Sequence, residues 1–290
     1  MPGHVSFAQH RVMLLTRLLS LGIAVFHIIG SADFNPLLPS QSAPIFTVSI
    51  GGWSVPISNH MFVVAVAALL LLVTIPLATR PRRMVPVGLQ NLVESICVFL
   101  REEVARPVMH ERTDRHIGFV WTIFFFILSL NLLGMVPSEK IITLLTGKEN
   151  RFGGPATANI FVTGGLATVT FFTTHICGIK QQGFGRYIIN FAPQAPWWIM
   201  PLLYFLEIVT AFVRPMTLAV RLFANIIAGH ILVATFCGLI LIFKNYGVAA
   251  ASVLAVVAVS CLELLVAFIQ AFIFTFLSTL YIGFSISPEH

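Results

Sequence analysis

Long apolar runs separated by short polar segments dominate the hydropathy pattern of this chain. Three of these runs, at residues 61–79, 117–136 and 159–178, are each long enough to cross a hydrocarbon core of ~30 Å at about 1.5 Å per residue. Their apolar positions are continuous rather than alternating, which favours helices over the strands of a closed barrel. The pattern therefore predicts an all-α, polytopic membrane protein.

The C-terminal part of the chain contains two much longer apolar stretches. Residues 197–243 show no clear break, and the polar residues 244–247 (KNYG) separate them from a second stretch at residues 248–282. At about 1.5 Å per residue the first stretch would be ~70 Å long, so it must tilt strongly, kink near Pro201 or Pro215, or run partly along the membrane interface. The polar residues between the two stretches predict a turn, and the three arrangements of the first stretch remain open.

The N-terminal residues 1–59 are expected to form a leader or anchor followed by a segment on the outer side. Their apolar run at residues 18–29 is short for a span, follows two arginines and precedes the small residues 30–32. This order is typical of a signal peptide or a short anchor, and a helix on the membrane surface is the alternative. Residues 60–290 are expected to form a single membrane domain.

The distribution of Lys and Arg predicts the orientation of the spans. Most basic residues outside the apolar stretches lie in the loops at residues 80–116 and 179–196, together with Arg11 and Arg17. Cytoplasmic segments carry an excess of Lys and Arg, so these loops belong inside. Residues 31–60, which contain neither residue type, then lie outside, and the C-terminus lies inside.

The loop at residues 80–116 contains an amphipathic segment. Its apolar residues recur at helical spacing and are Leu89, Leu92, Val93, Ile96, Phe99 and Leu100. Charged side chains such as Glu94 and Arg101 lie opposite them. We expect a helix that lies on the cytoplasmic membrane surface or packs on a partner, and both arrangements remain open.

The composition agrees with a chain that is mostly surrounded by lipid. Hydrophobic residues make up 57% of it and charged residues only 10%, against about 25% charged residues in soluble domains, which excludes a soluble globular protein. The net charge of +6 does not indicate a nucleic-acid partner, because the basic residues form no stripe and no RNA-binding signature. The cysteines lie singly without a CxxC pair, so no metal site, disulfide framework or cofactor is expected.

The two C-terminal stretches contain polar and ionisable residues that lipid does not tolerate. They are Glu207, Arg214, Arg221, Asn225, His230, Glu263 and Gln270. An ionisable group at bilayer depth costs from ~2.5 to over ~10 kcal/mol, so such groups face water, a partner charge or a functional path. An interhelical hydrogen bond with a purely structural role is the alternative for most of them. Arg214, directly before Pro215, is expected to snorkel or to bind carbonyls that the proline frees.

Helical geometry sorts these residues by face. At about 100° per residue, Glu207 and Arg221 lie within about 40° of each other, and Asn225 shares their face. On the last helix, Glu263 and Gln270 are seven residues apart and therefore also share a face.

Antiparallel packing of the two stretches brings residues whose numbers sum to about 491 to a similar depth. His230 is then level with Cys261, two residues from Glu263, the only carboxylate of the last stretch. We therefore predict a pair between His230 and Glu263, since a histidine partner is one way in which a buried carboxylate is tolerated.

These residues carry a specific resemblance. The sequence RLFANIIAGH at residues 221–230, followed by QAFIF at residues 270–274, closely resembles the a subunit of F-type ATP synthases, the stator part of their membrane proton channel. The match extends upstream to NLLGMVP at residues 131–137, and the order of spans fits from about residue 60 to the end. The resemblance implies a non-catalytic channel subunit with five or six transmembrane helices, of which the last two form a long, strongly tilted C-terminal hairpin against a ring of c subunits. Further implied partners are b-type peripheral stalk subunits, the catalytic sector and membrane lipid.

The resemblance also implies the residues of the proton path. They are Arg221, Asn225, His230, Glu263, Gln270 and Glu207. Arg221 would match the essential stator arginine, and Glu207 the acidic residue of the cytoplasmic path. His230 and Glu263 occur in the order found in mitochondrial-type members.

Two departures leave the outer entrance of this path open. Gly134 and Asn159 occur where certain members carry acidic residues, and Glu139 and His175 are weak substitutes. His175 lies near a predicted span end, where an interfacial position is the simpler interpretation.

The expected function is proton translocation through two offset half-channels that load and unload rotor carboxylates, which couples proton flow to ring rotation and ATP synthesis. No nucleotide-binding loop occurs in the sequence, so nucleotide chemistry would reside in other subunits. A proton-coupled secondary transporter is the alternative, but no inverted repeat is visible in the sequence. The leader-like N-terminus favours a bacterial plasma membrane, with the mitochondrial inner membrane as the alternative.

Overall fold

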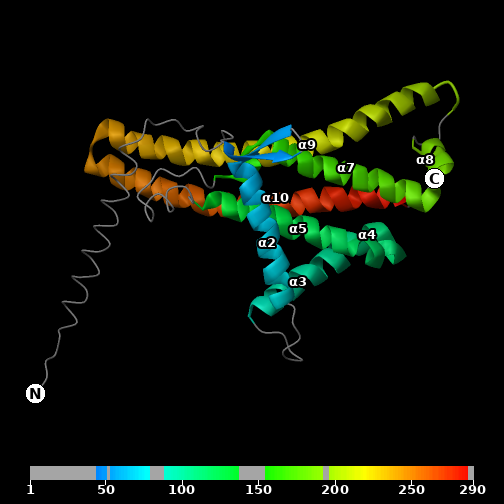
Figure 1. Ribbon diagram of the computed structural model, residues 1–290, viewed down its shortest axis with the longest axis horizontal. Coiled ribbons are helices and arrows are strands. Elements are labelled where there is room, and N and C mark those ends of the chain that lie inside the picture. The colour runs from blue at the N-terminus through cyan, green and yellow to red at the C-terminus, as the bar shows by residue number, and fades with distance from the viewer. Residues whose placement is uncertain (1–43, 51–52, 79–87, 137–153, 192–195, 287–290) are drawn as a thin grey trace, which may run out of the picture. The chain divides into compact units, whose positions relative to one another are not determined.

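The computed structural model describes residues 44–50, 53–78, 88–136, 154–191 and 196–286 (Figure 1). Five helical stretches of these residues are long and apolar enough to cross a membrane. Their membrane-spanning helices are α2 (Asn59–Ala78), α5 (Thr113–Met135), α7 (Ile160–Gln182), α9 (Met200–Phe243) and α10 (Tyr246–Ile286). The predicted helical membrane fold is therefore confirmed, and the apolar run at residues 18–29 lies outside the described residues.

A short antiparallel hairpin precedes the first of these helices and was not predicted. It pairs β1 (Pro44–Ile50) with β2 (Trp53–Ser58) in a register that places Val48 opposite Val55. The β-branched and aromatic residues of both segments favour strands, and two glycines separate them in the sequence. The hairpin falls within the segment that the charge distribution assigns to the outer side.

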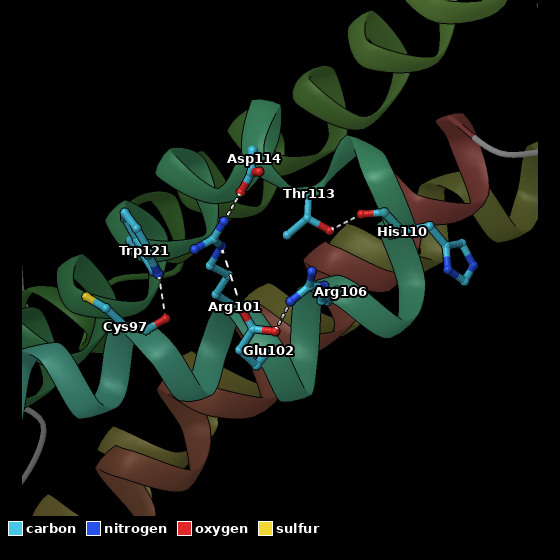
Figure 2. A network of polar contacts seen from close by, with 8 residues as sticks. All are labelled: Cys97, Arg101, Glu102, Arg106, His110, Thr113, Asp114 and Trp121. Carbon is cyan, nitrogen blue, oxygen red and sulfur yellow. Dashed lines mark hydrogen bonds and ion pairs between the residues drawn. The ribbon is translucent and has the colours of Figure 1, made fainter.

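The amphipathic segment before α5 folds back on that helix (Figure 2). It consists of α3 (Leu89–Phe99), the π-helical η2 (Leu100–Ala105), α4 (Arg106–Met109) and the short 3₁₀ segment η3 (His110–Arg112). The chain turns at His110, whose φ is +50°. Arg101 then pairs with Asp114 at 2.6 Å, and Trp121 Nε1 donates to the Cys97 carbonyl at 3.0 Å.

The buried stripe of this segment is narrower than the sequence indicates. Leu100 and Val104 are buried in the main apolar cluster, and Val93 packs against it. Leu92 and Phe99 instead remain exposed, because the helix contacts the rest of the chain along one side only. The predicted amphipathic helix is therefore present and packs within the chain itself, while its position on a membrane surface stays a prediction.

Two compact units divide the long helices α9 and α10. One unit comprises residues 37–229 and 261–290, and the other includes residues 230–260. Within the second unit, α9 ends at Phe243 and α10 begins at Tyr246, as the polar residues there predict. Asn245 Oδ1 accepts a hydrogen bond from the Gly247 amide at 2.8 Å and so caps the start of α10. The predicted domain boundary at residue 59 stays a prediction.

The length of α9 agrees with the expected tilt. Its 44 residues form one continuous helix with Pro215 inside it. A helix of this length measures about 66 Å, twice the thickness of a hydrocarbon core, so it can remain in a membrane only if it is steeply inclined.

Candidate functional site

Polar side chains recur every seven residues along one face of α9. Glu207 and Arg214 form an ion pair at 3.0 Å, with 26% and 32% of their side chains exposed. The Arg214 guanidinium also lies 5.1 Å from the centre of the Tyr281 ring on α10. The expectation that Arg214 snorkels or binds carbonyls near Pro215 is therefore wrong, because seven residues are two helical turns and bring the arginine within reach of the carboxylate.

A cavity of about 650 Å³ adjoins this ion pair. Glu207, Arg214 and Tyr281 line it, together with His175 of α7 and Tyr187 of α8 (Phe184–Ile189). His175 Nδ1 and the Tyr187 hydroxyl are 2.5 Å apart and share a hydrogen bond. Burial raises the pKa of Tyr187, so this hydroxyl keeps its proton at neutral pH. With His110 of η3, six ionisable side chains thus line this one space.

A second polar cluster lies further along α9, at residues 225–229, and on the part of α10 that packs there, within the same compact unit. Glu263 and Gln270 of α10 are only 8% and 4% exposed. A Cβ added at Gly229 of α9 would lie 2.5 Å from Glu263 Oε1, so the carboxyl group packs directly on the α9 backbone. This contact joins residues whose numbers sum to 492, which confirms the antiparallel register expected for the two helices.

Several polar atoms of the second cluster are buried without a hydrogen-bond partner among the described residues. Glu263 Oε1, Gln270 Nε2 and Asn225 Nδ2 belong to this group. A buried polar atom without a partner costs about 1–3 kcal/mol, and ordered water commonly supplies the missing bond. These three side chains therefore have hydrogen-bonding capacity that water or another polar group can use.

Asn131 of α5 adds a third helix to this cluster. Its Nδ2 donates to the Ala267 carbonyl at 3.4 Å, while its Oδ1 is buried and has no partner among the described residues. The residue opens the NLLGMVP motif but was not singled out as a site residue, although an amide within an apolar run is the signal that could have identified it. Gly134, one turn later, packs closely, since a Cβ there would lie 3.2 Å from the Pro155 side chain, which would have to shift by a few tenths of an ångström for a larger residue.

An apolar layer separates the cavity from the second cluster. Leu218 and Leu222 of α9 and Phe274 of α10 belong to one cluster and are at most 1% exposed. Arg221 lies between the two leucines, but its side chain is exposed and takes part in no ion pair within the described ranges. Arg221 is thus level with the apolar layer, and its exposed side chain is directed away from that layer.

The structure brings the expected site residues together only in part. Glu207 belongs to the cavity, whereas Glu263, Gln270 and Asn225 lie beyond the apolar layer. His230 is half-buried and begins the other compact unit, so its pairing with Glu263 stays a prediction.

Comparison with known proteins gives a consistent result. Residues 60–283 match the family model described as ATP synthase A chain. A protein of Chloroherpeton thalassium named ATP synthase subunit a is 34% identical over 92% of this chain and 77% of its own length. A protein of Myxococcus xanthus with the same name is 37% identical over 81% of this chain and 74% of its own length. On the strength of the family match over most of its length, this chain is a member of the ATP synthase A chain family.

Proposed function

We propose that this chain is the stator subunit of the membrane sector of an F-type ATP synthase and forms two offset proton half-channels. The observation that carries the proposal is the apolar layer of Leu218, Leu222 and Phe274, with a polar cluster on each side of it. The buried hydroxyls on α10 between the clusters, those of Thr275, Ser278 and Thr279, each donate to a backbone carbonyl of the same helix, so no ionisable side chain of α10 continues through the layer. A proton that enters one cluster therefore needs a carrier outside this chain to reach the other.

The proposed carrier is a carboxylate of a rotor c subunit. The outer half-channel would use His230, Glu263 and Gln270, with Asn225 at its inner end, and the inner half-channel would use Glu207. Arg221 stays protonated and cannot relay a proton, so it blocks a direct leak between them. Its attraction for a carboxylate at ~4 Å is about 4 kcal/mol at an effective dielectric of ~20, which favours proton release there.

Rotation follows from the cost of a charge in lipid. A protonated rotor carboxyl group can face the hydrocarbon core, whereas an ionised one cannot do so readily. The driving free energy is about 2.3 kcal/mol per proton for each 100 mV of membrane potential. The other partners would be b-type peripheral stalk subunits, the catalytic sector and membrane lipid, and the bacterial origin of the relatives favours a bacterial plasma membrane.

The test is ATP-driven acidification of vesicles that contain the complete complex with Arg221→Ala. We expect pumping to be lost while the complex stays assembled, and Arg221→Lys to fail as well because an ammonium lacks the planar fork and can shed its proton. The matched control is Arg115→Lys, an exposed arginine on α5 outside the α9–α10 pair, which should pump normally. Unchanged pumping with Arg221→Ala would refute the proposal, and stabilisation of the chain by a transported solute would favour a secondary transporter.

A further inference from the structure

The cavity beside the Glu207–Arg214 ion pair contains a second pair of proton-carrying groups, His175 and Tyr187. His175 lies near the end of α7, and Tyr187 belongs to α8, which begins after the single residue Gly183. Their hydrogen bond uses Nδ1 of the imidazole. The other ring nitrogen, Nε2, forms no hydrogen bond within the part of the chain that the structure describes, and the residue lines the cavity.

The position of His175 associates it with the inner side and not with the outer entrance. The helix that carries it leads into residues 179–196, which the distribution of Lys and Arg places in the cytoplasm. It shares the cavity with Glu207, on the opposite side of the apolar layer from Glu263. His175 therefore cannot replace the acidic residue that the outer entrance lacks.

The pair is fixed by close packing of three helices. A Cβ at Gly178, one turn after His175, would collide with the Tyr187 ring and the Ser285 hydroxyl, so both pack directly on α7. Ser285 Oγ of α10 donates to the Thr174 carbonyl at 3.0 Å, next to the histidine. The imidazole also packs edge-on against the Phe171 ring, and the centres of the two rings are 4.3 Å apart. Such support from several elements holds the ring in one orientation.

The other ionisable groups of the cavity are less suited to passing a proton. Arg214 cannot release one, and one oxygen of Glu207 is occupied by the arginine. Tyr187 keeps its proton because burial raises its pKa. An imidazole, in contrast, accepts and donates a proton near neutral pH, and the hydrogen bond of one ring nitrogen decides which proton state the other has. Two imidazoles line the cavity: His110 is exposed at the turn before α5, whereas His175 is held between helices by its hydrogen bond to Tyr187.

We propose that His175 is a proton-carrying residue of the inner cavity and that Tyr187 is its positioning residue, an inference that rests on the proposed function. In the proposed neutral state Nδ1 carries the proton and donates it to the Tyr187 hydroxyl oxygen, so that Nε2 is unprotonated and is the nitrogen that exchanges protons with the cavity. Nε2 takes a proton from a hydronium ion in the cavity, which leaves water, and then gives the same proton to the next water. No other bond forms or breaks.

The experiment measures passive proton flow through reconstituted complexes after removal of the catalytic sector, driven by a potassium diffusion potential. His175→Ala should lower the flow about tenfold or more, because a positioned proton carrier contributes ~10²–10⁴-fold and cavity water bypasses part of it. Imidazole added to the face that carries residues 80–116 should restore the flow, which a purely structural role of the histidine would not allow. His175→Gln, which retains polarity but carries no proton, should be equally slow.

Two further variants complete the test. Tyr187→Phe preserves the ring and removes the hydroxyl, so we expect a smaller loss that imidazole does not repair. His116→Ala is the matched control, since this half-buried histidine contacts Cys177 at 3.7 Å and does not line the cavity. Its flow should equal that of the parent with or without imidazole.

The outcomes separate this inference from the proposed function. Flow at the parent rate in His175→Gln, or a loss in His175→Ala that imidazole does not restore, would overturn the role of His175. If Arg221→Ala abolishes pumping at the same time, the proposed stator function survives that result. Normal pumping with Arg221→Ala would refute the proposed function itself.

Discussion

Replacing Gly229 by alanine should slow proton conduction strongly without unfolding the chain. The new Cβ would lie 2.5 Å from Oε1 and 2.8 Å from Cδ of Glu263, whereas ordinary contacts begin at 3.4 Å. The carboxyl group must therefore withdraw by about 1 Å, a displacement that can cost ~100-fold in a positioned proton transfer. Because a flexible side-chain end moves rather than the backbone, the folding cost should remain near the low end of the ~1–3 kcal/mol typical of overpacking.

The assay is passive proton flow in vesicles with the assembled complex, together with the thermal stability of the purified complex. We expect Gly229→Ala to lower the flow by about 10- to 100-fold with little change in stability. Gly165→Ala is the matched control, because a Cβ at this helical glycine of α7 would meet no atom within 4 Å. This control should conduct like the parent.

A second-site change tests the geometric explanation directly. Glu263→Asp shortens the side chain by one methylene and withdraws the carboxyl group from α9. The double variant Gly229→Ala with Glu263→Asp should therefore conduct faster than Gly229→Ala alone. If Gly229→Ala conducts at the parent rate, the carboxyl position against α9 has no part in proton transfer, and the proposed outer path is wrong at this point.

Three further changes test other parts of the site. Glu207→Gln alone leaves the half-buried Arg214 without its carboxylate. It should therefore destabilise the complex by about 1 kcal/mol more than the double variant Glu207→Gln with Arg214→Gln. A double-mutant cycle of melting temperatures measures this coupling. Burial raises the pKa of Tyr187, so the stability that its neutral form contributes should persist below pH ~10 and be lost at higher pH. The difference in tyrosinate absorbance between the parent and Tyr187→Phe checks that ionisation. Leu222→Asn should hydrate the apolar layer and produce a proton leak that persists when the rotor carboxylates are chemically blocked.

Hydropathy predicted the membrane helices closely because lipid burial requires long continuous apolar runs with satisfied backbone hydrogen bonds. The antiparallel register of α9 and α10 also followed from the sequence, because one short turn fixes the depth of every later residue. Contacts between segments that are distant in the sequence could not be predicted in this way. Asn131, for example, meets Ala267 across α5 and α10, and nothing in local periodicity encodes that contact.

The ion pair of Glu207 and Arg214 was missed for a different reason. Its signal was present, since the two residues are seven apart on one helical face. Because Arg214 precedes Pro215, it was expected to bind carbonyls that the proline frees. The helix α9 instead continues through the proline without a break. The β-hairpin before α2 was not predicted because its strands of seven and six residues are too short to produce the hydropathy signal of a membrane span.

The apolar layer explains why a permanently charged residue belongs at this depth of α9. Leu218, Leu222 and Phe274 are buried apolar side chains, and the nearby hydroxyls of α10 donate to backbone carbonyls, so an unaccompanied proton would have to cross a region without an ionisable partner. Arg221 cannot relieve that barrier from inside, because its side chain is exposed and directed away from the layer. It can act only on a charge that arrives from outside the chain. Under the proposed function, the structure that prevents a leak is therefore the same one that makes a mobile rotor carboxylate necessary.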